Sequence, residues 1–428
     1  MNSAPKSLRL HIGLFGRTNV GKSSFLNMIA GQDVAIVSRI PGTTTDVVEK
    51  PMELLPLGPV VFLDTAGVDD GSELAPLRLA RTRKVFDRAE VIAVILEPGT
   101  WTGYESEILS EAERRGTPVI LVVNKADLQA PSREFLALLR EKSARVLTCS
   151  SVDAEGREAA VSAFTEHLLD ACPEEFLSPP PLVGDLLSSG RGVATAVLVV
   201  PIDLQAPRGR LILPQVQAIR DCLDSDAAVV VVKEREYAAF LEQMRVPPDI
   251  VVCDSQVVLK VTADTPPGVP CTTFSILFAR SKGDLVTLAR GAAVLTDLRP
   301  NDRVLVAEAC SHHAIEDDIG RVKIPRWLRQ YAGADVAIDT CAGKDYPENL
   351  RDYRVVIHCG GCMLTRREML SRIELARRAG VAITNYGVAI SVLQGVIERA
   401  LSPFPAALDA FLRERERIRQ PVGAGGPR

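Results

Sequence analysis

The sequence predicts an α/β protein with three consecutive domains, and three observations lead to this fold class. The chain has 428 residues, and at about 100–200 residues per domain this length indicates two or three hydrophobic cores. Short apolar runs alternate with helix-like segments, which is the order of strand and helix crossovers around parallel sheets. A stretch rich in proline, glycine and serine, PEEFLSPPPLVGDLLSSGRG, separates the first part of the chain from the rest.

Composition narrows the class of protein. Hydrophobic residues make up 46% of the chain, enough apolar material for these cores. No apolar run reaches the roughly 18 residues of a membrane span, and the first residues lack a signal-peptide cleavage pattern. A net charge of −4 with 5% aromatic residues gives no footprint for nucleic acid. We therefore expect a soluble, cytoplasmic protein with no membrane and no nucleic-acid partner, and we place its domains at residues 1–172, 183–264 and 266–428.

The first domain opens with a phosphate-binding loop. A strand-like run, LRLHIGLF, is followed by GRTNVGKSS and by the helix-like FLNMIAG, so the pattern GxxxxGK[ST] stands in its required strand–loop–helix context. Backbone N–H groups of such a loop surround the phosphates, Lys22 reaches the β and γ oxygens, and the Ser23 hydroxyl binds magnesium. The loop residues expected to contact the nucleotide are Gly16, Asn19, Val20, Gly21, Lys22, Ser23 and Ser24.

A second motif, VVFLDTAG, ends a buried-strand pattern at Asp64. We expect the Asp64 carboxylate in the second shell of the magnesium ion and the Gly67 N–H against the γ-phosphate. These positions follow the phosphate-binding loop in the order that a P-loop GTPase needs. The sequence therefore predicts a GTPase fold for the first domain.

A third motif, VILVVNKAD, ends another strand pattern at Asn124, Lys125 and Asp127. A carboxylate at Asp127 accepts two hydrogen bonds from the guanine edge, whereas adenine would leave it unpaired at a large cost in affinity. The later stretch TCSSVD, around Ser150 and Ser151, resembles the loop whose backbone reads the guanine oxygen. We therefore expect GTP to be the nucleotide.

Between the first two motifs lies a polar loop, SRIPGTTTDVVEK. It resembles the effector loop of the TrmE-Era-EngA group of GTPases, which read GTTRD or GVTRD there. The resemblance implies that Thr44 binds magnesium when GTP is present, with Thr43 as the alternative, while Thr45 replaces the usual arginine. Order in such a loop depends on the γ-phosphate. The side chains and backbone groups expected to support hydrolysis are Lys22, Thr44, Asp64 and Gly67, and the magnesium set is Ser23, Thr44 and Asp64.

Two positions set the expected mechanism of hydrolysis. Val68 stands where Ras-like proteins place the glutamine that orients the attacking water, and an apolar side chain cannot polarise water. Related GTPases use an asparagine at the position of Asn19 to hold a potassium ion against the phosphates. We therefore expect slow intrinsic hydrolysis that potassium stimulates. The alternative for Asn19 is an amide that only stabilises its loop.

The middle domain shows no catalytic constellation. VATAVLVVPID, AAVVVVKE and DIVVCDSQVV are apolar strand patterns separated by helix-like segments, which predicts a small parallel sheet buried on both faces. Polar residues at the strand ends, Asp203, Lys233, Glu234 and Asp254, suit a solvated edge better than catalysis. We expect a dimerisation or docking unit with an exposed sheet edge.

The last domain is predicted to be doubly wound, with three strand patterns that end in cysteines. NDRVLVAEAC ends at Cys310, DVAIDTC ends at Cys341, and YRVVIHCGGC ends at Cys359 and Cys362. Strand ends of an open parallel sheet meet on one edge, so Cys310 can converge with the Cys359/Cys362 pair. Zinc takes Cys and His freely, but three thiolates at buried strand ends suit a four-iron cluster better. The other cysteines, Cys149, Cys172, Cys222, Cys253 and Cys271, are interpreted as small buried hydrophobes.

Taken together, the GRTNVGKSS loop, the middle domain and the C-terminal Cys-x-His and His-Cys-x-x-Cys motifs resemble the FeFe-hydrogenase maturation GTPase family, HydF, over nearly the whole chain. The resemblance implies a homodimeric scaffold that binds GTP and a 4Fe-4S cluster. It also implies that a di-iron precursor from the radical-SAM maturases HydE and HydG passes transiently through this scaffold to apo FeFe-hydrogenase. These expectations extend well beyond what the motifs alone indicate.

The family's functional residues transfer by position. The cluster cysteines fall on Cys310, Cys359 and Cys362, and the family histidines on His312 and His358. Either histidine is a candidate for the fourth ligand. The alternatives are water or one of the nearby acidic residues Glu316, Asp317 and Asp318, while His313 is an additional polar loop residue.

One rival hypothesis is a zinc-stabilised TrmE- or Era-like GTPase switch that acts in tRNA modification or ribosome assembly. TrmE-like proteins carry a cysteine motif after an all-helical domain, which this chain lacks. A ribosome-assembly GTPase should carry an RNA-binding module with a basic loop. The terminal RERERIRQ is charged, but its mixed signs indicate a solvated helix end.

Overall fold

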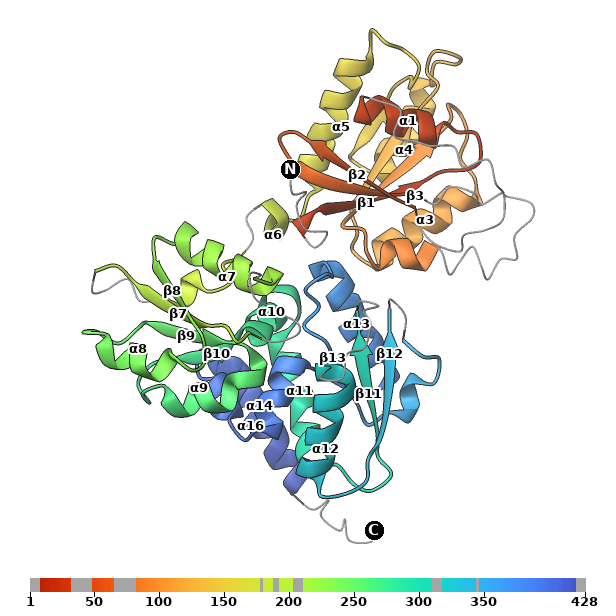
Figure 1. The fold of residues 1–428 in the computed structure, drawn as a ribbon. Coiled ribbons are helices and arrows are strands. Elements are labelled where there is room, and N and C mark those ends of the chain that lie inside the picture. The colour runs from red at the N-terminus through yellow and green to blue at the C-terminus, as the bar shows by residue number, and fades with distance from the viewer. Residues whose placement is uncertain are drawn as a thin grey trace. The chain divides into compact units, whose positions relative to one another are not determined.

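The computed structural model describes residues 8–31, 48–64, 82–177, 180–187, 192–202, 211–309, 318–343 and 346–420. The chain divides into two compact units, residues 1–179 and 180–428, which are described separately (Figure 1). Within the described residues, no helix combines the length and the apolar character needed to cross a membrane.

The first unit contains one six-stranded sheet with the order β2-β3-β1-β4-β5-β6. Its strands are β1 (Leu10–Phe15), β2 (Val48–Leu54), β3 (Gly58–Asp64), β4 (Val91–Leu96), β5 (Val119–Val123) and β6 (Val146–Thr148). Only β2 is antiparallel to its neighbour. The strand patterns that the sequence predicted for the three GTPase motifs are therefore confirmed as β1, β3 and β5.

Helices cover both faces of this sheet, and each face has its own core. The helices are α1 (Lys22–Ala30), α3 (Gly103–Arg114), α4 (Arg133–Lys142), α5 (Arg157–Ala171) and the short α6 (Glu174–Leu177). On one face α1 and α5 meet where Phe164 packs edge-on to Phe25, 5.1 Å between ring centroids. On the other face α3 and α4 supply residues such as Ile108 and Leu139. Burial on both faces explains why these strands are almost wholly apolar.

The second unit begins with a four-stranded parallel sheet of order β10-β9-β7-β8. Its strands are β7 (Thr195–Val199), β8 (Ala228–Val232), β9 (Ile250–Cys253) and β10 (Cys271–Thr273), and its helices are α7 (Leu213–Asp224), α8 (Tyr237–Gln243) and α9 (Val258–Asp264). The expected strand DIVVCDSQVV stops at Cys253. Asp254 accepts the Gln256 N–H and begins a helical turn, so the apolar residues that follow are helical.

A second parallel sheet follows, of order β12-β11-β13-β14. Its strands are β11 (Arg303–Glu308), β12 (Ala337–Ala342), β13 (Val355–His358) and β14 (Ala382–Asn385). The surrounding helices are α10 (Phe274–Lys282), α11 (Leu285–Ala292), α12 (Ile324–Ala332), α13 (Arg366–Ala379), α14 (Tyr386–Leu393), α15 (Ile397–Ala400) and α16 (Pro405–Arg419). The strand order reverses between β11 and β13, which confirms the doubly wound prediction and gives this sheet a switch point there.

The two sheets of the second unit share one core. A continuous set of buried residues runs from Leu182 to Phe411 through both sheets. Strand β10 belongs to the first of these sheets although it lies beyond residue 264, where the sequence suggested a boundary. The division of the second unit into domains at residues 183–264 and 266–428 stays a prediction.

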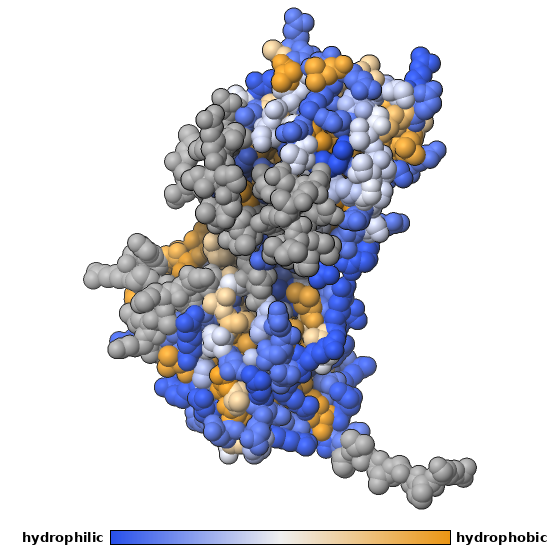
Figure 2. All heavy atoms as spheres, turned by 90° about the vertical axis from the view of Figure 1, so that its right-hand side faces the viewer, coloured by the Kyte–Doolittle hydropathy of each residue, from blue (hydrophilic) through white to orange (hydrophobic). Residues whose placement is uncertain are grey.

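On the face drawn in Figure 2, hydrophobic side chains alternate with larger polar areas. Exposed apolar residues of this kind are normal for a folded chain. One of the exposed apolar side chains lies on an edge strand of a sheet: Val231 of β8 is 43% exposed.

Helix α11 packs so closely on β14 that Gly291 is essential to the contact. A Cβ at Gly291 would collide with the backbone carbonyl of Ile383. We expect Gly291→Ala to lower the free energy of unfolding by about 1–3 kcal/mol, because strand backbone cannot yield. This outweighs the helix propensity of alanine, worth about 1 kcal/mol. Denaturant unfolding measures the effect, with Gly268→Ala as control because no atom lies within 4 Å of its added Cβ. Equal stability of the two variants would contradict the packing argument.

Candidate functional site

The phosphate-binding loop joins β1 to α1 with a backbone that favours glycine. Gly16 has φ +151° and Gly21 has φ +92°, both in the region that side chains rarely adopt. A Cβ at Gly16 would also lie 2.7 Å from the Ile95 carbonyl oxygen. Asn19, with φ +64°, is the non-glycine residue of the loop in the left-handed region. The loop therefore depends on these residue types at these positions.

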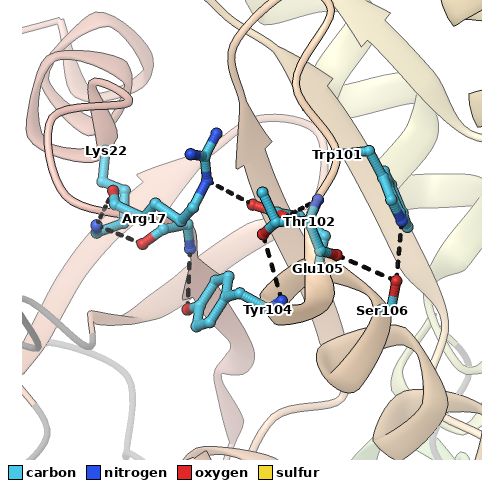
Figure 3. Close-up of polar contacts among 8 residues, drawn as sticks. Arg17, Lys22, Trp101, Thr102, Tyr104, Glu105 and Ser106 are labelled. Carbon is cyan, nitrogen blue, oxygen red and sulfur yellow. Dashed lines mark hydrogen bonds and ion pairs between the residues drawn. The ribbon is translucent and has the colours of Figure 1, made fainter. Parts of the chain in front are cut away.

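Lys22 begins α1 and turns its ammonium over the loop (Figure 3). It donates to the carbonyl oxygens of Gly16 at 2.6 Å and Arg17 at 2.9 Å. Ser23 is half-buried beside it, and Ser24 is exposed on the first turn. The N-terminus of α1 directs its backbone N–H groups at the same place. An anion bound at this loop would therefore contact the Lys22 ammonium and the N-terminus of α1 on the same side.

Helix α3 braces this loop, a contact that the motifs did not indicate. Arg17 donates from Nε to Glu105 at 3.0 Å, and the Gly16 N–H donates to the Tyr104 hydroxyl at 3.4 Å (Figure 3). Glu105 is fully buried and also accepts the N–H and hydroxyl of Thr102, which caps α3. These hydrogen bonds, opposed by burial, hold the pKa of Glu105 below its usual value. A buried carboxylate thus ties the loop to the start of α3.

Asp64 ends β3 at the same edge of the sheet and is 2% exposed. Its Oδ2 lies 3.5 Å from the Lys50 ammonium. Its Oδ1 is buried and has no hydrogen-bond partner among the described residues. A buried carboxylate oxygen needs a donor or a cation. The donor chemistry at Asp64 therefore fits the hydrated magnesium ion that the sequence predicted.

Asn124, predicted to contact the nucleotide, connects the loops around it. It is 1% exposed. Its amide donates to the Val20 carbonyl oxygen at 3.0 Å, and its Oδ1 accepts the N–H and the hydroxyl of Ser151 at 3.0 and 2.8 Å. The amide thus joins the phosphate-binding loop to the loop after β6. The structure brings these predicted residues together.

The other two residues predicted to bind GTP in this motif, Lys125 and Asp127, lie in the turn after Asn124. Lys125 has φ +59° and pairs with Glu97 at 2.6 Å. Asp127 is exposed at the end of the turn, where a ligand can reach its carboxylate. Ser150 has a buried hydroxyl without a hydrogen-bond partner in the described part of the chain. This geometry is compatible with the predicted guanine site.

Several predicted residues lie outside the described ones. In the first unit they are Thr43, Thr44, Thr45, Gly67 and Val68, and in the second unit Asp203, Cys310, His312, His313, Glu316 and Asp317. Of the three acidic candidates for a fourth ligand, only Asp318 is described. It is buried, and its side chain accepts the Arg321 N–H at 2.8 Å.

The predicted metal corner stands at the switch point of the last sheet. Cys359 directly follows β13, and Cys362 follows after two glycines, of which Gly361 has φ +61°. Both thiols are half-buried. The Ala309 N–H, at the end of β11, donates to the Cys359 sulfur at 3.2 Å. Cys310, the next residue, lies outside the described part of the chain, so its convergence with Cys359 stays a prediction.

This donor set fits a soft metal centre. Thiolates select iron–sulfur clusters or zinc, and backbone N–H groups commonly donate to their sulfurs. Among the described residues, no three His, Cys, Asp or Glu side chains gather as a metal site. Cys310 would supply the third thiol. Cys341 is the second-last residue of β12, which ends on the same edge, and burial raises the pKa of its thiol.

His358 ends β13 and is fully buried with both ring nitrogens engaged. Nδ1 lies 2.7 Å from the Cys359 carbonyl oxygen, and Nε2 lies 2.9 Å from the Arg372 guanidinium. A guanidinium only donates, so Nε2 accepts and the proton belongs on Nδ1. Burial, and then the charge of Arg372, lower the pKa of His358 to about 3. A metal could bind His358 only by displacing one of these partners.

Lys282, at the end of α10, was not singled out from the sequence. It is buried, and its ammonium donates to the carbonyl oxygens of Cys362 at 2.9 Å and Leu364 at 3.0 Å. Burial lowers its pKa to about 8. In the sequence, a lysine before Gly283 is indistinguishable from an ordinary exposed helix end.

The sheet order of the first unit and its phosphate-binding loop define a P-loop GTPase domain, and residues 11–125 match the 50S ribosome-binding GTPase family. Two further families match the second unit. Residues 182–283 match the Hydrogen maturase F dimerization domain, and residues 286–403 match the Hydrogen maturase F tetramerization domain. The chain therefore belongs to the hydrogen maturase F family, HydF, as the sequence motifs suggested.

Curated relatives that match part of this chain include three tRNA modification GTPases. The tRNA modification GTPase MnmE of Bacillus cereus is 31% identical over 201 residues, which cover 45% of this chain and 43% of that protein. MnmE of Synechococcus sp. is 39% identical over 122 residues, 28% of this chain and 26% of that protein. MnmE of Paraburkholderia xenovorans is 31% identical over 249 residues, 53% and 50% respectively. The chain thus spans half or less of the length of these relatives.

Solved structures with similarity to this chain include two GTPases. The G domain of the FeoB iron transporter of T. maritima is 22% identical, with a TM-score of 0.29, and the match covers 37% of this chain and 98% of that one. Era in complex with MgGDPNP and a segment of 16S ribosomal RNA is 17% identical, with a TM-score of 0.32 and coverage of 52% and 91%.

Proposed function

We propose that this chain is a GTP-hydrolysing scaffold that binds a 4Fe-4S cluster and assembles or delivers the di-iron precursor for apo FeFe-hydrogenase. The observation that carries the proposal is the hydrogen bond from the Ala309 N–H to the Cys359 sulfur. This bond joins the residue before Cys310 to Cys359, and it supports the proposal in a chain that belongs to the hydrogen maturase F family. Three thiols can then face one cluster from two adjacent strand ends.

In the nucleotide half, Lys22 and the N–H groups of the phosphate-binding loop bind the phosphates. Ser23 and Thr44 ligate magnesium, and the unpaired Oδ1 of Asp64 supports that assignment from the second shell. Asp127 reads the guanine edge, while Asn124 keeps the loops together. The further contacts assigned to the nucleotide are Gly16, Asn19, Val20, Gly21, Ser24, Lys125, Ser150 and Ser151, with Gly67 at the γ-phosphate.

In the metal half, Cys310, Cys359 and Cys362 hold the cluster. Of the two histidines, we favour His312 as the fourth ligand, because both nitrogens of His358 are already hydrogen-bonded. When bound, a cluster of this kind supplies an iron with an exchangeable ligand. The exposed side of the Cys359–Cys362 loop would let a di-iron precursor, handed over by HydE and HydG, approach and leave.

Metal content tests this proposal directly. After anaerobic reconstitution we expect about four irons and four sulfides per chain, as one 4Fe-4S cluster requires. We expect an EPR signal after dithionite reduction that Cys359→Ser abolishes, with Cys172→Ser as a control because Cys172 is buried in the first unit. Stoichiometric zinc without iron would overturn the scaffold proposal and favour the zinc-stabilised GTPase switch.

Potassium dependence tests the nucleotide half. We expect GTP hydrolysis to be several-fold faster in potassium chloride than in sodium chloride, because a potassium ion held by Asn19 would neutralise developing phosphate charge. Asn19→Gly isolates the role of the amide, because glycine readily adopts the φ of +64° found at this position and only the side-chain amide is lost. Loss of the potassium effect in this variant supports the assignment. Equal rates of the unaltered protein in both salts would sink it.

Self-association is supported by the two matched families, which are named for dimerization and tetramerization. Strand β8 is a sheet edge whose side chains are exposed or half-buried, whereas the other edge strand, β10, is buried. An exposed apolar edge favours pairing with a second strand. We therefore propose a homodimer through β8 and expect Val231→Lys to shift it to monomers in light scattering. A dimer unaffected by this variant would exclude the β8 edge.

A further inference from the structure

Lys282 is the only buried lysine in the described part of the chain, and all of its bonding is to one loop. Its ammonium donates to the carbonyl oxygens of Gly361 at 3.4 Å, Cys362 at 2.9 Å and Leu364 at 3.0 Å. An ammonium has three protons to donate, so this loop takes them all. The carbonyl groups of Gly361, Cys362 and Leu364 therefore surround the Lys282 ammonium.

A second side chain joins the loop after β13 to the end of α10, this time with the donor on the loop side. Arg366, the first residue of α13, donates from Nη1 to the carbonyl oxygens of Ser281 at 3.0 Å and Gly283 at 3.1 Å. The last carbonyls of a helix lack partners within it, so Arg366 completes the end of α10. The end of α10 and the loop after β13 thus hold each other by side chain to backbone bonds on both sides.

Burial of this charge needs a physical reason. Lys282 forms no ion pair with a carboxylate among the described residues, and its charge is stabilised by carbonyl dipoles, by the Phe278 ring 5.0 Å from the ammonium and, at longer range, by the Glu368 carboxylate. A neutral apolar side chain would fill the site without the desolvation cost of a cation. The loop that Lys282 supports carries two thiols, and thiolates with an iron–sulfur cluster bring negative charge to the front of that loop. A cation behind it offsets this charge.

We propose, on the basis of the proposed function, that Lys282 is a positioning residue for the cluster. It fixes the Cys359–Cys362 loop in the geometry that ligates iron, and its charge raises the reduction potential of the bound cluster. Reduction adds one electron to an already anionic centre, so a nearby cation favours the reduced form. Partners of this kind affect metal affinity by about 10–100-fold.

The test compares Lys282→Met with the unaltered protein. Methionine keeps the length of the stem but carries no charge and no donor. We expect the reconstituted variant to lose iron to a chelator about tenfold faster or more, and its cluster to titrate at a more negative midpoint potential by EPR. In the metal-free protein we expect faster hydrogen exchange at residues 361–364. Lys260→Met is the matched control, because Lys260 is an exposed lysine on α9.

A second variant, Lys282→Arg, and the exchange measurement on the metal-free protein separate the role of the charge from that of the loop. Lys282→Arg keeps the charge, so its midpoint potential should stay close to that of the unaltered protein even if packing suffers. A potential that falls equally in both variants would show that charge is not the cause. Unchanged chelator loss, potential and exchange in Lys282→Met would overturn the inference. If the unaltered protein binds no iron, the proposed function fails, while the exchange measurement still decides whether Lys282 holds the loop.

Discussion

Neighbouring parallel strands end at the same edge of their sheet, and both sites of this chain depend on that constraint. In the first sheet β1, β3 and β5 end at the phosphate-binding loop, at Asp64 and at Asn124. In the last sheet the crossovers diverge between β11 and β13, so the segments that leave these strands are not separated by a connecting helix. Cys359 meets Ala309 there. The predicted nucleotide site and the proposed metal site thus follow from one geometric rule.

The common edge of the strands fixes the positions of the loops only approximately. Hydrogen bonds from buried polar side chains then fix the conformation of each loop. Asn124 uses its amide to join two loops, Arg372 joins the His358 ring to the Gly343 carbonyl, and Lys282 gathers three carbonyls. An unpaired buried polar group costs about 1–3 kcal/mol, so loops that leave such groups without partners are disfavoured. Each site therefore has one arrangement of its backbone.

Sequence reasoning identified the strands and the motif positions because these follow from local rules. Buried parallel strands are apolar throughout, and the positive φ of Gly16 and Gly21 requires glycine. The turn at Asp254 was misread as strand, since capping overrides a β-branched run. Lys282 and Arg372 were missed for another reason. Their partners lie 14 to 82 positions away in the chain, and burial of a charged side chain depends on that tertiary pairing and leaves no local pattern.

The distribution of the cysteines has a consequence for chemical selectivity. Burial raises the pKa of Cys149 and Cys222 to about 12 and that of Cys172 to about 11, so these thiols stay protonated and enclosed. Only the thiolate attacks oxidants and captures metals. Cys359 and Cys362 are only half-buried at the end of β13. Among the described residues, a metal ion or an oxidant therefore reaches this edge of the last sheet more readily than it reaches Cys149, Cys172 or Cys222.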